Sequence, residues 1–169
     1  SRSRQSHKVA LHLEELAQQW EDFHGRMIDL ADYPVPLDES STLTERLQEF
    51  DNFILVFDAR NQSYPLSLRM MLEHAQEAFH NKVVAVSIIA DDSETERLAY
   101  HSITSMLLGL QAVPLSTRLL VTKAEQRFDQ NLDVPDPLFG ARMEAFLETF
   151  LSFFREPLRV VGLNKNNPR

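Results

Sequence analysis

The stretch Phe53-Ile54-Leu55-Val56-Phe57 is a continuous apolar run with no polar residue in it. A strand without polar alternation is typical of a parallel sheet, because helices cover both faces of such a sheet. Two more apolar runs follow at residues 82–89 and 118–122, and apolar residues at helical spacing separate the three runs. This alternation predicts an α/β fold with a parallel sheet and helices on both faces.

The rest of the chain continues the same alternation. The predicted helices span residues 7–24, 42–50, 68–79, 93–109 and 138–155, and two short apolar strands are predicted at 27–30 and 158–163. Thr42 with Glu45, and Ser93 with Glu96, have the spacing of helix N-terminal capping boxes. With the last strand included, the sheet has five strands.

The two ends of the chain look like two halves of one unit. Residues 158–169 read as an apolar strand that runs into a polar loop, and residues 1–8 read as a Ser/Arg-rich loop that opens a helix. Placed tail before head, they form a strand, a basic loop and a helix N-terminus, and a helix N-terminus with free N–H groups can bind phosphate. We therefore predict a circularly permuted order in which strand 158–163 lies in the middle of the sheet. The alternatives are a disordered tail, a fragment, an engineered rearrangement, or a strand exchanged between subunits.

Composition narrows the function classes. The 169 residues are expected to form one domain, residues 1–169, and the net charge of −8 argues against general nucleic-acid binding. No apolar run suggests a membrane span or a signal peptide, and the absence of cysteine excludes disulfides and fits a cytoplasmic protein. The six histidines show no metal-binding spacing, so no metal is expected.

The segment after the first apolar run carries a family resemblance. Residues 58–69, DARNQSYPLSLR, resemble the P-E-Y-N-x-S-x-P-x-x-L-K motif of the NAD(P)H-dependent FMN reductase family. Residues 28–36 look like the second strand of that family, and residues 109–114 look like the segment before its fifth strand. Residues 1–10 look like the distal part of its G-S-x-R-x-x-S loop.

The resemblance implies a three-layer flavodoxin-like fold, FMN as cofactor and NAD(P)H as substrate. It implies a reductase that passes hydride or electrons to an unknown small-molecule acceptor, and a homodimer. It assigns no catalytic side chain. The cofactor-binding residues that it implies are Ser1, Ser3, Arg4, Ser6 and Asn164 around the phosphate, and Arg60, Asn61, Gln62, Ser63 and Asp91 around the ring.

The motif also has a purely structural interpretation. Asn61 and Ser63 can shape a tight turn and cap the following helix, and Pro65 suits the first turn of that helix. These residue types therefore explain a helix start as well as a ligand site.

Three departures from the family pattern support a second hypothesis. Arg60 stands where the family has Tyr, Asp58-Ala59 replace Pro-Glu, and residues 90–94, ADDSE, replace a loop that is usually Gly-rich. Side chains and carboxylates in that loop would crowd a flat ligand and repel a reduced flavin. The acidic residues could instead form the favourable first turn of a helix. The alternative function is a non-catalytic flavodoxin-like binding protein or subunit that has lost flavin.

Overall fold

Three parallel strands form the centre of the structure. The computed structural model describes residues 5–21, 23–33, 42–59, 61–123, 128 and 134–155. The strands β1 (Asn52–Asp58), β2 (Val83–Ile89) and β3 (Val113–Val121) lie in the order β1-β2-β3. The parallel α/β architecture predicted from the sequence is therefore confirmed.

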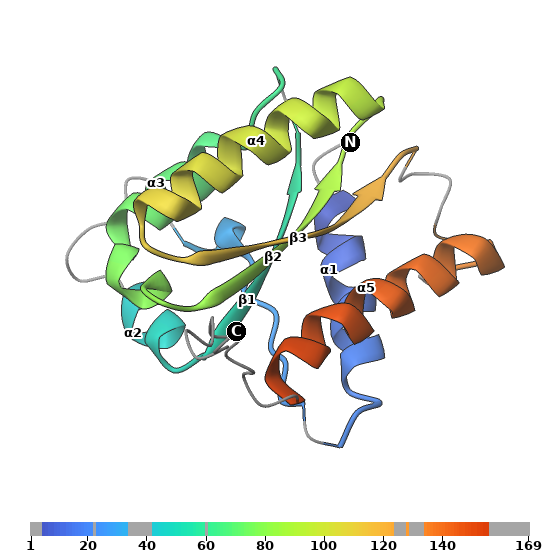
Figure 1. The fold of residues 1–169 in the computed structure, drawn as a ribbon, viewed down its shortest axis with the longest axis horizontal. Helices are drawn as coiled ribbons and strands as arrows, with labels where there is room; N and C mark the ends of the chain where they lie inside the picture. The colour runs from blue at the N-terminus through green and yellow to red at the C-terminus, as the bar shows by residue number, and fades with distance from the viewer. Residues whose placement is uncertain are drawn as a thin grey trace, which may run out of the picture.

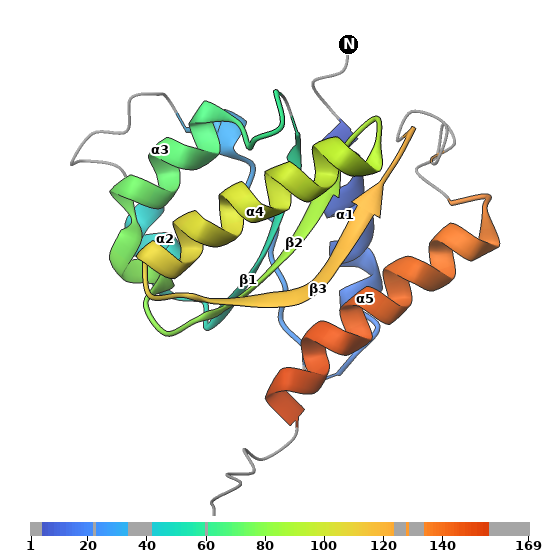
Figure 2. The same ribbon diagram turned by 45° about the horizontal axis from the view of Figure 1, so that its top comes forward.

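Helices cover both faces of this sheet. Helices α3 (Leu66–His74) and α4 (Ser93–Gly109) lie on one face, and α1 (Gln5–Ala17) and α5 (Pro137–Arg155) lie on the other (Figure 1). Figure 2 shows the same three layers from a second direction. The shorter elements are η2 (Leu30–Asp32), α2 (Leu43–Gln48) and η3 (Gln76–Phe79).

Each face of the sheet has its own apolar core. On β2, Val84, Val86 and Ile88 join the cluster under α3 and α4, whereas Ala85 and Ile89 join the cluster under α1 and α5. This division follows from strand geometry, because successive side chains point to opposite faces. Each large apolar side chain buried in this way contributes roughly 1.5–3 kcal/mol, so the two cores hold the layers together.

The predicted strand at 27–30 is wrong. Residues 23–29 form no regular element, and η2 begins at Leu30. The Asp29 side chain accepts a hydrogen bond from the Ala31 main-chain N–H at 2.9 Å, and the Met27 N–H donates to the Glu14 carboxylate at 2.8 Å. Aspartate side chains compete with strand ladders in this way, and the Asp29 side chain instead caps the 3₁₀ helix η2.

The five-stranded sheet is therefore not what the structure shows, since the described part of the chain contains three strands. The predicted strand 158–163 lies outside the described residues, so the permuted order stays a prediction.

Several boundaries also differ from the prediction. Helix α1 ends at Ala17 rather than near residue 24, α3 stops at His74 before a separate 3₁₀ turn, and β3 begins at Val113 rather than at 118. Strand β3 contains Pro114, which a strand can hold where no neighbour needs its N–H. Because proline is unusual inside a strand, the first half of β3 was not predicted from the sequence.

The two predicted capping boxes are also wrong. Asp92, not Ser93, caps α4, and its side chain accepts from the Thr95 N–H at 2.7 Å. Thr42 makes no side-chain cap bond to α2. Glu96 turns into the structure instead of back toward the helix start, and it pairs with Arg118.

Candidate functional site

The loops at the carboxyl end of the sheet bring predicted site residues together. In parallel α/β folds, ligands bind outside this end of the strands. Asn61, Gln62 and Ser63 follow β1, and Asp91 follows the neighbouring strand β2. The structure therefore places these four residues on adjacent loops at one end of the molecule. Ser6 lies in the first turn of α1.

The turn after β1 has an unusual backbone. Asn61 and Gln62 both have positive φ angles, 50° and 61°, although neither is glycine. The left-handed conformation costs a non-glycine residue roughly 1–2 kcal/mol. Two such residues in succession persist only where surrounding contacts hold them, and strain of this kind gathers at functional sites.

Contacts from α4 and β1 hold the following residues. The hydroxyls of Ser63 and Ser102 lie 3.3 Å apart, and the Tyr64 ring packs edge-on against Phe57 with 6.4 Å between ring centres. Ser63 thus bonds to α4 and does not cap α3, and Pro65 lies at the N-cap of α3 rather than in its first turn. The predicted role of Ser63 as a cap of α3 is therefore wrong.

A cleft opens beside this turn, between α3 and α4. Its volume is about 490 Å³. It is lined by Tyr64, Arg69, Ser102, Ser105, Met106, Gly109 and Leu110. Sequence reasoning missed Ser102 and Ser105, because serines on a helix surface carry no signal of their own.

The acidic loop after β2 is partly a helix start. Both oxygens of Asp92 accept hydrogen bonds from Thr95, from its N–H at 2.7 Å and from its hydroxyl at 3.0 Å. The bond from the Thr95 N–H is the largest cause that lowers the pKa of Asp92. Asp92 is therefore the N-cap of α4, whereas the Asp91 side chain is exposed in the loop.

A side-chain contact joins the start of α1 to the segment that follows this helix. The His7 Nδ1 atom lies 2.8 Å from the Asp29 carboxylate. The pKa of Asp29 is lowered, first by the hydrogen bond from the Ala31 N–H and then by His7, while partial burial opposes the shift. This pair, 22 residues apart in sequence, was not predicted, because no local pattern marks it.

The remaining predicted site residues lie outside the described part of the chain. They are Ser1, Ser3, Arg4, Arg60 and Asn164. In the ranges that the structure does cover, no group of three or more His, Asp or Glu side chains could hold a metal ion. No helix within those ranges is long and apolar enough to cross a bilayer.

Solved structures share this fold. FerB, a flavoenzyme NAD(P)H:(acceptor) oxidoreductase from Paracoccus denitrificans, superimposes with a TM-score of 0.73 at 18% identity, covering 87% of each chain. The apo form of the NADH:FMN oxidoreductase EMOB gives 0.70 at 18% identity, covering 93% of this chain and 87% of that one. An oxidoreductase from Corynebacterium diphtheriae gives 0.65 at 14% identity, covering 86% of this chain and 84% of that one. At these identities the similarity establishes the fold alone.

The sequence comparison identifies the family. No curated protein matches the chain. A family model described as NADPH-dependent FMN reductase matches residues 1–126, which is more than half of the chain. The resemblance seen at residues 58–69 is thereby confirmed. The chain belongs to the NADPH-dependent FMN reductase family, whose cofactor is FMN and whose reducing substrate is NAD(P)H.

Proposed function

We propose that this chain is an FMN-binding, NAD(P)H-dependent reductase that passes hydride or electrons to a small-molecule acceptor. Family membership supports the class of reaction. The observation that carries the proposal is the pair of consecutive left-handed residues, Asn61 and Gln62, at the carboxyl end of β1. A folded chain keeps such strain where it shapes a binding surface.

The described part of the site fits a flavin ring. A tight turn brings backbone close to a flat ligand, and Ser63 is fixed to Ser102 beside it. The Asp92 carboxylate is held at the first turn of α4, where the N–H and the hydroxyl of Thr95 donate to it. Asp91 remains exposed at the rim. We therefore assign Asn61, Gln62, Ser63 and Asp91 to the ring side.

On the phosphate side we assign the start of α1. Ser6 lies in its first turn, where free N–H groups favour an anion. Ser1, Ser3, Arg4 and Asn164 belong to this side by the family resemblance, and Arg60 belongs to the ring side. FMN, when bound, supplies the hydride chemistry, so the protein need only bind and orient the reactants.

Three further proposals accompany this function. We take residues 1–169 as one domain, and we expect a homodimer on the family resemblance. A cytoplasmic location is consistent with a sequence that has no cysteine.

FMN titration tests the site with a matched pair of variants. Gln62 and Gln111 share the left-handed backbone region, with φ angles of 61° and 58°, but Gln111 lies in the turn before β3, at the opposite end of the sheet. Gln62→Gly loosens the proposed ring turn, so we expect FMN affinity to fall about tenfold, which equals roughly 1.4 kcal/mol. Gln111→Gly removes the same strain elsewhere and should leave the affinity unchanged.

FMN binding by the wild-type chain distinguishes the proposed reductase from the non-catalytic alternative. Quenching of FMN fluorescence and bleaching of the flavin band by NADPH are expected. A folded chain that binds no FMN would overturn the proposal and support the non-catalytic alternative. Equal losses in the two glycine variants would show that the turn after β1 is not part of the site.

A further inference from the structure

The cleft between α3 and α4 has a lining that differs in charge from the chain as a whole. The chain carries a net charge of −8, but none of the residues that line the cleft is acidic, and Arg69 is a cation. Tyr64, Ser102 and Ser105 add hydroxyl groups to the lining, and a hydroxyl can donate a hydrogen bond. The cleft therefore favours a ligand that carries negatively charged oxygen atoms.

The guanidinium of Arg69 is oriented by its neighbour on the same helix. Its Nε donates to the Glu73 carboxylate at 2.8 Å. For its two terminal amino groups, no hydrogen bond occurs among the described residues, and such groups bind two oxygens of a phosphate. Glu73 does not line the cleft, and its side chain is 51% exposed, so water and salt screen its charge.

The same cleft also has an apolar part. Met106 and Leu110 line it beside Gly109. A Cβ atom placed on Gly109 meets no other atom within 4 Å, so the wall is open at this residue. The volume of about 490 Å³ lies in the range of small-molecule sites. The cleft is thus suited to a ligand with an apolar ring as well as an anionic group.

The position of the cleft sets the length of the ligand. Its Ser102 contacts Ser63, which belongs to the turn on the proposed ring side. Helices α3 and α4 both begin at the carboxyl end of the strands (Figure 2), so the cleft leads away from the ring side. Gly109 follows Ser102 by seven residues of α4, which corresponds to about 10 Å along the helix axis. A ligand that occupies both places has to be elongated.

The proposed function supplies an elongated ligand of this chemistry. NADPH carries the hydride on its nicotinamide ring, and at its other end it carries an adenosine with a 2′-phosphate, which NADH lacks. We propose that the cleft between α3 and α4 binds the adenosine 2′-phosphate end of NADPH, with Arg69 on the phosphate and Met106 and Leu110 against the adenine. The identity of this ligand rests on the proposed function. Arg69 is then the residue that selects NADPH over NADH.

Titration with a fragment of NADPH tests the cleft without flavin. Adenosine 2′-monophosphate is added to the wild-type chain in the absence of FMN, and main-chain amide shifts are followed by nuclear magnetic resonance. We expect this fragment to bind at least about tenfold more tightly than adenosine, with shifts at residues 64–69 and 102–110. Equal affinity for adenosine, or shifts confined to other residues, would overturn the proposal. Inorganic phosphate that binds as tightly as the fragment would also overturn it, because the cleft would then be a site for free phosphate.

A matched pair of arginine variants tests the selection of NADPH. Arg69→Met removes the cation, so the ratio of kcat/KM for NADPH to kcat/KM for NADH should fall about tenfold. Arg97→Met is the control, because Arg97 is an exposed arginine of α4 that does not line the cleft. The control should keep the wild-type ratio. An unchanged ratio in Arg69→Met would contradict the proposal.

Filling the cleft gives a second, steric test. Gly109→Leu extends a side chain into the open space at this wall, so affinity for adenosine 2′-monophosphate should fall at least about tenfold. Gly109→Ala adds a single carbon and should change the affinity little. FMN affinity, measured in both variants, should stay at the wild-type value, since Gly109 does not belong to the ring side. Equal affinities for the fragment in the two variants would overturn the assignment of the cleft.

The two kinds of measurement separate this inference from the proposed function. A chain that binds the fragment in the cleft but binds no FMN supports the phosphate site and refutes the reductase. A chain that binds FMN and oxidises NADPH, but shows no effect of Arg69→Met on the preference, keeps its proposed function and refutes the inference.

Discussion

The two edges of the sheet are built on different principles. At β3, Tyr100 of α4 and Arg142 of α5 donate hydrogen bonds to main-chain carbonyls of the edge strand. At β1, residues 53–57 are all apolar, and no such partner of the outward main-chain groups of Ile54 and Val56 occurs within the described ranges. Closure by side chains leaves a finished edge, whereas an apolar edge strand requires another piece of chain.

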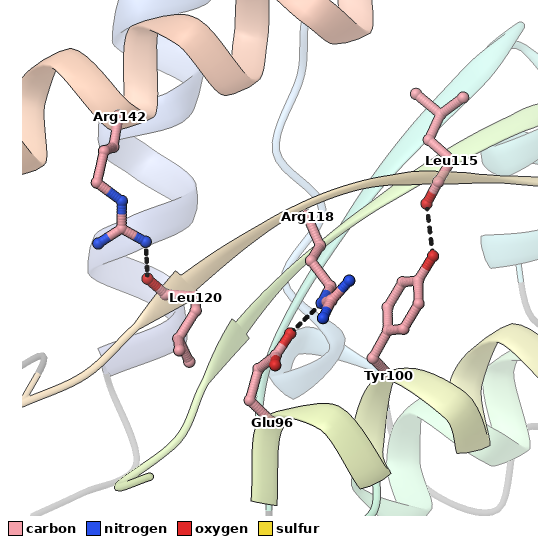
Figure 3. Close-up of polar contacts among 6 residues, drawn as sticks. All are labelled: Glu96, Tyr100, Leu115, Arg118, Leu120 and Arg142. Carbon is pink, nitrogen blue, oxygen red and sulfur yellow. Dashed lines mark hydrogen bonds and ion pairs between the residues drawn. The ribbon is translucent and has the colours of Figure 1, made fainter. Parts of the chain in front are cut away.

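The β3 side also contains the ion pair of Glu96 with Arg118, in which the carboxylate is buried. The Glu96 side chain is only 6% exposed, and its partner Arg118 is 35% exposed. The Arg118 guanidinium also lies 4.3 Å from the centre of the Tyr100 ring (Figure 3). A buried carboxylate costs several kcal/mol unless a partner satisfies it, so the β3 side depends on a small polar network that has to remain complete.

Removing the arginine of this network is expected to have the largest effect. Arg118→Met leaves the Glu96 carboxylate buried without its partner, and we expect a loss of about 2–3 kcal/mol in the free energy of unfolding, measured by urea denaturation. The double variant Glu96→Leu with Arg118→Met removes both charges and should recover most of the loss.

The opposite result would change the comparison between the edges. If Arg118→Met unfolds within about 0.5 kcal/mol of the wild type, which is the range of ordinary surface substitutions, the polar network does not stabilise the β3 side. The hydrogen bonds from Tyr100 and Arg142 to the Leu115 and Leu120 carbonyls would then close this edge without the ion pair.

Removing one hydroxyl at the same edge should have a smaller effect. Tyr100→Phe leaves the Leu115 carbonyl without its donor, at the place where the β3 register shifts. We expect a loss of about 1–1.5 kcal/mol in the free energy of unfolding. Tyr64→Phe is the matched control, because no hydrogen bond of its hydroxyl occurs among the described residues. Equal losses in the two variants would show that the Leu115 carbonyl does not need its partner.

The difference between the edges also explains what the sequence could predict. Residues 53–57 and 82–89 were predicted as strands, because a continuous apolar run has one main interpretation. The first half of β3 was missed, because Pro114 and the polar residues of an edge strand interrupt the apolar signal. The pair of Glu96 with Arg118 was missed as well, since 22 residues separate its members.

The candidate site was predictable only in part. The family motif located Asn61, Gln62 and Ser63, and the structure places them on one turn. The left-handed backbone of Asn61 and Gln62 was not predictable, because glycine usually marks that conformation and neither residue is glycine. The contact of Ser63 with Ser102 spans 39 residues. Residue types therefore indicated the position of the turn, and tertiary packing decided its shape.

The smallest effect is expected on the segment at 23–33, which carboxylates hold to α1. Asp29 has a pKa below its ordinary value of 3.8, because it accepts from the Ala31 N–H and lies beside His7. A group whose folded pKa is lowered adds stability above its unfolded pKa, and that stability disappears as the pH falls through the folded value. The stability of the wild type should therefore fall between roughly pH 5 and pH 3, with a contribution from Asp29 below about 1 kcal/mol.

Asp29→Asn removes that contribution, so urea midpoints measured across this pH range should fall less steeply than in the wild type. Asp32→Asn is the matched control, because the exposed Asp32 side chain, three residues away, makes no bond to His7. Superimposable pH profiles for Asp29→Asn and the wild type would mean that this segment is held without its carboxylate. The segment would then depend on the hydrogen bond from the Met27 N–H to Glu14 and on the packing of Ile28 and Leu30, which contact the apolar cluster under α3 and α4.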